Sequence, residues 1–132
     1  MVFDSAIAEI IPFMKRMGYR KNRNNFVKRT NEVALAVSFQ KSVYGCVWFL
    51  YFGATALSIL DVNSFSAPNY PVVYRFEGLS LNRDQIEYAV RLWEEKYGTF
   101  EKLVISAVEN KLPRTSNASF VGELCSQAWR YM

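Results

Sequence analysis

Residues 33–40 read VALAVSFQ, the clearest two-residue alternation in this 132-residue sequence. The larger side chains of the stretch are Val33, Leu35, Val37 and Phe39. Because successive side chains of a β-strand point to opposite faces of a sheet, the alternation predicts a strand with large residues on one face and small ones on the other. We expect a helix to pack close to one of these two sides.

Further strands are predicted on either side of this stretch. Asn24-Asn25 is typical of a turn, and residues 26–29 (FVKR) form a short strand after it. The aromatic run 46–53 (CVWFLYFG) predicts the antiparallel neighbour, buried on both faces and ending at Gly53. Residues 63–71 hold two prolines, two asparagines and two serines and predict a loop, and residues 72–76 a further strand.

The N-terminal residues predict a helix. Ile7, Ile10, Ile11 and Met14 recur at the spacing of one helix face. Asp4 or Ser5 could cap its start, and Gly18 is placed to end it. Pro12 falls within the segment, so we expect either a kink or a helix that begins afresh near Ile11.

The last third of the chain predicts three helices. The first has Asn82 as N-cap, Gln85 at the capping-box position and Gly98 at its end. Thr99 caps the second, which ends before Pro113 and turns inward Leu103, Val104, Ala107 and Val108. The apolar stripe of the third comprises Val121, Leu124, Cys125, Ala128, Trp129 and Met132. The expected fold is α+β: an N-terminal helix, an antiparallel sheet of four to five strands and C-terminal helices packed on one face, within one domain over residues 1–132.

Composition narrows the function. The chain has no histidine, which excludes Ser-His-Asp and Cys-His nucleophile systems and histidine-based zinc sites. Its two cysteines, Cys46 and Cys125, are expected to be buried free thiols, with a disulfide between them as the alternative. We expect no cofactor and no metal. The N-terminus lacks the basic start of a secretory signal, so a cytoplasmic protein is expected.

One segment resembles a membrane span in length. Residues 42–60 carry no charge, which approaches the length that crosses a bilayer. Gly45, Gly53 and many aromatic and β-branched residues favour a buried strand followed by a bend, and we expect no membrane contact.

The positive charge is concentrated in the first third. Residues 1–45 hold eight basic and three acidic residues, whereas the remainder holds eight and nine. Three interpretations stay open: exposed positions of an ordinary hairpin, a surface for an acidic protein or ligand, and a nucleic-acid surface. Nucleic acid is the least favoured, because Phe26 is the one aromatic residue between Arg20 and Arg29.

A second polar cluster follows the alternating strand, at residues 40–44 (QKSVY). Lys41 and Ser42 are adjacent on a strand and would point to opposite faces, which disfavours a Ser-Lys nucleophile pair. Glu94 and Glu95 are expected to be solvated, and the tryptophans Trp48, Trp93 and Trp129 to lie in the core.

The best hypothesis is a non-enzymatic protein-binding domain that uses a basic hairpin and the end of the strand. The alternatives are a small-ligand-binding protein or enzyme with a pocket between sheet and helices, and a weak nucleic-acid binder. The candidate binding surface comprises Arg20, Lys21, Arg23, Lys28, Arg29, Gln40, Lys41, Ser42 and Tyr44.

Three short motifs carry a family resemblance: Gly18-Tyr19-Arg20-Lys21, residues 24–29 (NNFVKR) and Phe39-Gln40-Lys41-Ser42. With them the sequence resembles an uncharacterised bacterial family classed as a domain of unknown function. The resemblance implies an α+β domain without an assigned activity. It also implies that a toxin-neutralising or other protein-binding role is to be tested.

Overall fold

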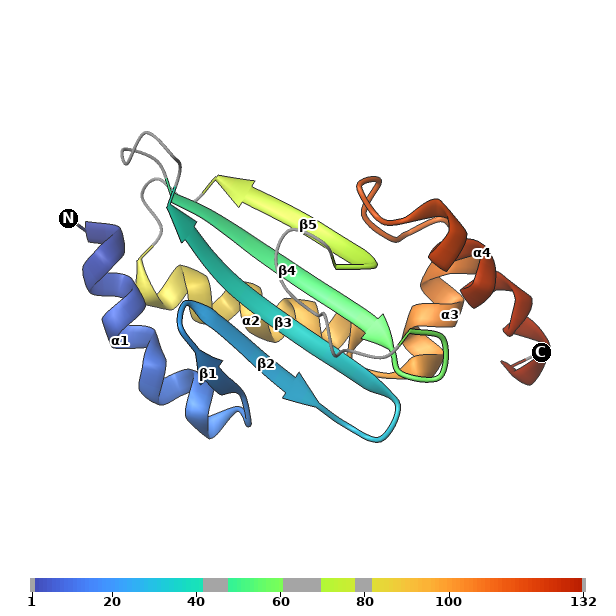
Figure 1. Cartoon of the computed structure of the whole chain (residues 1–132), viewed down its shortest axis with the longest axis horizontal. Coiled ribbons are helices and arrows are strands. Elements are labelled where there is room, and N and C mark those ends of the chain that lie inside the picture. The colour runs from blue at the N-terminus through green and yellow to red at the C-terminus, as the bar shows by residue number, and fades with distance from the viewer. Residues whose placement is uncertain (1, 42–47, 61–69, 78–81, 132) are drawn as a thin grey trace.

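The structure, a computed structural model, describes residues 2–41, 48–60, 70–77 and 82–131. Its centre is an antiparallel sheet in which the strands follow one another in chain order (Figure 1). The strands are β1 (Arg20–Asn22), β2 (Asn25–Arg29), β3 (Val33–Lys41), β4 (Trp48–Ala56) and β5 (Val72–Glu77). This confirms the expected sheet and adds the short strand β1 to it.

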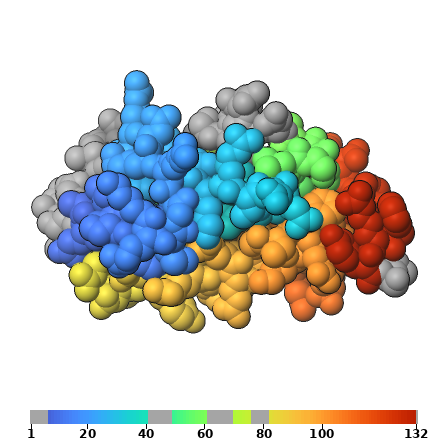
Figure 2. All heavy atoms as spheres, turned by 90° about the horizontal axis from the view of Figure 1, so that it is seen from below, coloured from blue at the N-terminus to red at the C-terminus, as the bar shows by residue number. Residues whose placement is uncertain are grey.

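The helices are α1 (Val2–Arg16), α2 (Arg83–Tyr97), α3 (Phe100–Val108), α4 (Ala118–Ser126) and the 3₁₀ turn η2 (Ala128–Tyr131). Figure 1 shows α1 and α2 behind the sheet, with α3 and α4 gathered at one end of it. Figure 2 shows α1 and the strands β1 to β3 side by side, with α2 running beneath them. The fold is α+β, with the helices on one face of the sheet. We call that face the helix side and the opposite one the outer face.

The first helix differs from its prediction at its start. α1 already begins at Val2, so Asp4 and Ser5 lie inside the helix and neither is its cap. It also runs through Pro12 without beginning afresh. Pro12 and Ala8, whose carbonyl loses its helical donor, are both on the exposed side, where water can satisfy that carbonyl. Gly18 ends the helix as predicted, with a left-handed φ of 93°.

The C-terminal helices confirm the predicted caps. The Asn82 side chain accepts from the Gln85 backbone N–H, Gln85 returns the bond, and Thr99 caps α3 through the Lys102 N–H. The inward residues are partly corrected. Val108 is exposed, because α3 ends at this residue, well before Pro113.

The apolar stripe predicted for the last helix is wrong in two places. Phe120 and Leu124 are the buried residues of α4, whereas Cys125 is an exposed free cysteine and Trp129 is 69% exposed. The α-helix ends at Ser126 and the chain continues as a 3₁₀ turn, so the helical phase that would have turned Trp129 inward is lost. Cys46 lies outside the described residues.

The helix side of the sheet carries the large residues. Phe26 of β2 and Phe39 of β3 meet edge to face, with ring centroids 5.8 Å apart. Leu35 and Val37 are also fully buried there and belong to the same core as Ile10 and Met14 of α1. The larger residues of the alternating strand therefore face the helices, as a two-layer core requires.

The outer face carries the small residues and is packed differently. Ala36, Val73 and Tyr70 form a separate buried cluster. The Tyr70 ring lies directly over Gly53, where a Cβ atom would be only 2.2 Å from ring carbons. The predicted end of the strand at Gly53 is therefore wrong: β4 continues to Ala56, and the glycine makes room for the ring.

The charge-free run 42–60 contains β4, a strand of the sheet. Among the helices in the described ranges, none is both long enough and apolar enough to span a bilayer.

Candidate binding site on the outer face of the sheet

Strand register places five polar residues in one line across the outer face. Asn22 pairs with Asn25, Asn25 with Ser38, Ser38 with Tyr51, and Tyr51 with Arg75, so that every strand contributes one residue. We call these five residues the polar row. Since neighbouring strands lie about 4.8 Å apart, four steps give the row a length of about 19 Å. Its central residue, Ser38, is fully buried, whereas Asn22 and Arg75 at its two ends are exposed.

The members of the row are held by neighbouring side chains. The Ser38 hydroxyl donates to Oδ1 of Asn25 at 2.5 Å. At the other end, the Arg75 guanidinium lies over the Phe49 ring, 5.0 Å from its centroid, and Phe49 lies 6.5 Å from the Tyr51 ring. A stacked guanidinium keeps its N–H edge available for a carboxylate, because stacking uses the face of the group.

Some of the predicted basic residues lie near this row. Arg20 pairs with Val27, which places it on the outer face beside the row, and Arg29 has the same orientation on β2. Arg23 is exposed in the β1–β2 turn, with a left-handed φ of 57°. Gln40 is half-buried and lies two residues beyond Ser38 on the same face of β3. The structure thus brings part of the predicted surface together.

Two other predicted residues are separated from it by strand alternation. Lys21 pairs with the core residue Phe26 and so lies on the helix side. Lys28 also lies on the helix side, where its Nζ is 2.7 Å from Oε1 of Glu94 on α2. The expectation that Glu94 is solvated is wrong. Its side chain is only 16% exposed, because it pairs with Lys28 beneath the sheet.

Next to this ion pair lies Tyr19, the aromatic residue of the Gly18-Tyr19-Arg20-Lys21 motif. Lys28 Nζ is 5.8 Å from the centre of the Tyr19 ring, and the buried hydroxyl of Tyr19 has no hydrogen-bond partner among the described residues. Burial and, to a smaller extent, the negative charge of Glu94 raise the pKa of Tyr19 well above its usual value. The aromatic residue of the motif is therefore a packing element on the helix side.

The remaining predicted positions fall where less is described. Lys41 is the last residue of β3, and its side chain is outside the described part. Ser42 and Tyr44 also lie outside the described residues.

Asn22, Asn25, Ser38, Tyr51 and Arg75 were not selected from the sequence. Each is an unremarkable polar residue in its own strand. The alternation of residues 33–40 already placed Ser38 on the face away from Phe39, but the register that joins it to Arg75 depends on the length of two connections.

The row suits binding better than proton transfer. Of the residues in the row, Ser38 has a hydroxyl of the kind that serves as a nucleophile in enzymes. This hydroxyl donates to the amide oxygen of Asn25, which cannot accept a proton as a general base does. Within the described ranges, no three Cys, Asp or Glu residues gather as metal ligands would.

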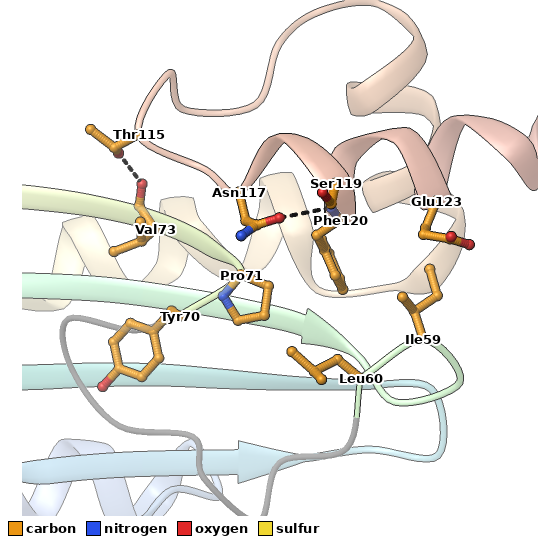
Figure 3. A pocket seen from close by; sticks show the side chains of 10 residues that line it. All are labelled: Ile59, Leu60, Tyr70, Pro71, Val73, Thr115, Asn117, Ser119, Phe120 and Glu123. Atoms are coloured by element: carbon orange, nitrogen blue, oxygen red, sulfur yellow. Dashed lines mark hydrogen bonds between the residues drawn. The ribbon is translucent and has the colours of Figure 1, made fainter.

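A hollow of about 500 Å³ lies between the start of β5 and α4 (Figure 3). Several of its polar groups already bond to the chain: Thr115 Oγ1 donates to the Val73 carbonyl at 2.5 Å, and the Asn117 side chain caps α4 by accepting from Phe120 N–H. Its charged lining residue is Glu123. The Thr115 bond and the bond from the Asn117 N–H to the Pro71 carbonyl fasten the start of α4 to the sheet, and the hollow offers an anion no cationic group among its lining residues.

A search of the curated proteins and a search of the solved structures found no match. A family model does match, over residues 10–112, which confirms the resemblance to an uncharacterised family. The matched region includes all five strands of the sheet together with α2 and α3. The chain belongs to the family described as Domain of unknown function (DUF4304).

Proposed function

We propose that the domain is a protein-binding module that takes an acidic polypeptide segment across the polar row. The observation that carries the proposal is the strand register, which aligns two amides, the Tyr51 hydroxyl and a guanidinium on one face, all on side chains that are at least partly exposed, around the buried Ser38. Amide and hydroxyl groups both donate and accept hydrogen bonds, as the backbone of a bound peptide requires. A toxin-neutralising partner is one form of this function.

The exposed charges of the outer face favour a negatively charged partner. Arg20 and Arg75 are exposed on the outer face at opposite edges of the sheet, and Arg23 is exposed at the adjoining turn. Lys28, in contrast, is neutralised by Glu94 on the helix side. An acidic segment that crosses the strands would meet a guanidinium near each end, which accelerates encounter and fixes the register of binding.

A protein partner is favoured over nucleic acid by the aromatic residues of the face. Single-stranded nucleic acid needs exposed rings on which bases stack. The Phe49 ring is already covered by Arg75, and Tyr51 is packed against the Tyr70 cluster.

The test is fluorescence anisotropy with a labelled 15-residue peptide rich in glutamate and a matched peptide in which glutamine replaces every glutamate. We expect the acidic peptide to bind more tightly than its neutral match. Arg75→Glu and Arg20→Glu should each weaken its binding about tenfold or more, since each replaces an attractive contact by a repulsive one. Lys102→Glu is the control: it makes the same charge change at an exposed position of α3.

Two results would overturn the proposal. One is an equal loss of affinity for Lys102→Glu and Arg75→Glu, which would indicate a response to net charge alone. The other is tighter binding of a 20-nucleotide single strand or duplex than of the acidic peptide, with a steep dependence on salt.

We also propose a cytoplasmic location. The exposed thiol of Cys125 supports it, because free surface thiols persist in reducing compartments.

A further inference from the structure

A second concave site lies away from the polar row, between β5 and α2. The cleft has a volume of about 450 Å³, within the range of sites that hold small molecules. Phe52 of β4 and Tyr74 of β5 line it from the sheet, and Tyr88 and Trp93 from α2. The connection after α3 contributes Leu112. Five of its eleven lining residues are aromatic.

Trp93, one of the lining residues, is held by a hydrogen bond and by two neighbouring rings. The indole Nε1 of Trp93 donates to the Gly53 carbonyl at 3.0 Å, and the bond is buried. Trp93 lies between Phe52 and Tyr97, with ring centroids 5.5 Å and 4.6 Å away. The Tyr97 hydroxyl donates to the Lys111 carbonyl at 3.0 Å, which fixes the connection after α3. A preformed aromatic wall spares a ligand the entropy of ordering it.

The charged residues that line the cleft are positive. Of the lining residues that the structure describes, Lys96 and Lys111 are charged and none is a carboxylate. Both lysines are exposed, so their ammonium groups can reach a ligand without being desolvated beforehand. Lys111 has a competing partner, since its Nζ is 3.2 Å from Oε1 of Glu109.

We propose that this cleft binds a small planar aromatic acid. The ring system would lie among Tyr74, Tyr88 and Trp93, and its carboxylate would face Lys96 and Lys111. Aromatic rings supply apolar contact and edge-to-face geometry for a flat ligand, and the two ammonium groups select a negative substituent. The site is separate from the polar row, because Phe52 and Tyr74 have the register of the helix side.

The experiment follows the Trp93 indole N–H resonance by NMR during titration with 2-naphthoate, and with uncharged 2-naphthamide as the matched probe. Trp93→Phe identifies that resonance among the three tryptophans. We expect naphthoate to shift this resonance and to bind more tightly than naphthamide. Tyr88→Ala should weaken both probes about fivefold or more, since it removes one aromatic wall.

The charged variants separate the two lysine contacts. Lys96→Gln should weaken naphthoate about three- to tenfold and leave naphthamide unchanged. Glu109→Gln should tighten naphthoate binding, because it releases Lys111 from its competing partner. Trp129→Ala is the control, an equally exposed aromatic residue outside the cleft, and should change neither affinity.

The proposal is overturned if millimolar naphthoate leaves the Trp93 resonance in place, or if naphthamide binds as tightly as naphthoate. It is also overturned if Trp129→Ala weakens binding as much as Tyr88→Ala does. Both positions are more than two-thirds exposed, so neither variant is expected to unfold the protein. None of these results bears on the peptide assay, which reports on the opposite face of the sheet.

Discussion

The two faces of the sheet are built from the same strands and are packed by different means. On the helix side, large side chains such as Phe26, Leu35 and Phe39 interdigitate with two helices. On the outer face, among the described residues, the Tyr70 ring lies over Gly53 and packs with Ala36 and Val73. A face with small side chains can be filled by a flat ring, whereas a face with large ones requires a helix layer about 10 Å away.

The difference assigns separate tasks to the two faces. The helix side holds a partly buried charged pair and the Tyr19 hydroxyl, which has no hydrogen-bond partner in the part of the chain that the structure describes, and its residues contribute to stability. On the outer face, Tyr70 fits tightly over Gly53. The exposed arginines of this face contribute little to the packing of the core. Substitutions on the two faces should therefore change the free energy of unfolding by different amounts and in different directions.

The largest effect is expected at Gly53, on the outer face. In Gly53→Ala the new methyl group would overlap the Tyr70 ring, which must move, and overpacking of this kind should cost about 3 kcal/mol of unfolding free energy. Urea denaturation followed by circular dichroism measures the loss.

Gly122→Ala is the matched control, because a Cβ atom there meets nothing within 4 Å. It should raise stability by up to about 1 kcal/mol, as alanine does in an exposed helix. Equal stability of Gly53→Ala and the native protein would mean that Tyr70 does not lie on Gly53.

A smaller effect is expected from the ion pair on the helix side. Lys28→Met leaves Glu94 largely buried without its partner, and should cost about 1–2 kcal/mol, less than a fully buried pair because Lys28 is 28% exposed. Combining Lys28→Met with Glu94→Leu should recover most of this loss, since both charges are then absent.

Lys21→Met is the control for the ion pair, because Lys21 lies on the same side of the hairpin but is exposed. Its stability should stay within about 0.5 kcal/mol of the native value. A thermodynamic cycle from urea unfolding gives the coupling energy, and additive effects of the two substitutions would show that the pair does not contribute.

The smallest effect is expected at Tyr19. Tyr19→Phe removes a buried hydroxyl that has no partner within the described ranges, so stability at pH 7 should be unchanged or higher by up to about 1 kcal/mol. The advantage should grow above pH 10. There the unfolded native chain releases the Tyr19 proton while the folded chain, in which burial raises the pKa, retains it, so the native protein loses stability as the pH rises.

Tyr97→Phe should have the opposite effect on stability at pH 7. Tyr97 donates to the Lys111 carbonyl, and loss of that bond should cost about 1 kcal/mol. Urea midpoints from pH 7 to pH 11.5 compare the two variants. A destabilised Tyr19→Phe at pH 7 would show that its hydroxyl has a partner.

Local patterns were good predictors where a few neighbouring residues determine the outcome. The strand predicted at residues 33–40, the cap at Asn82 and the stop at Gly18 are confirmed. The cap and the stop depend on backbone groups within one turn, and the strand was predicted from the alternation of side chains along its own length. The family was also foreseen, from motifs that lie within the matched region.

The errors have a common cause. Glu94 was expected in solvent and Trp129 in the core, and both were read from the helical phase alone. The position of Glu94 depends on a lysine 66 residues away, and that of Trp129 on a change from α-helix to 3₁₀ turn.

The sequence by itself was sufficient for the α+β class, the excess of positive charge in the first third and the separation of large from small residues along β3. It could not show which arginines share a face with Ser38, that Lys28 is neutralised by Glu94, or that Gly53 lies beneath Tyr70. These depend on register and on contacts between distant segments. Each is selected by packing energy summed over the whole core, which no short stretch of the chain contains.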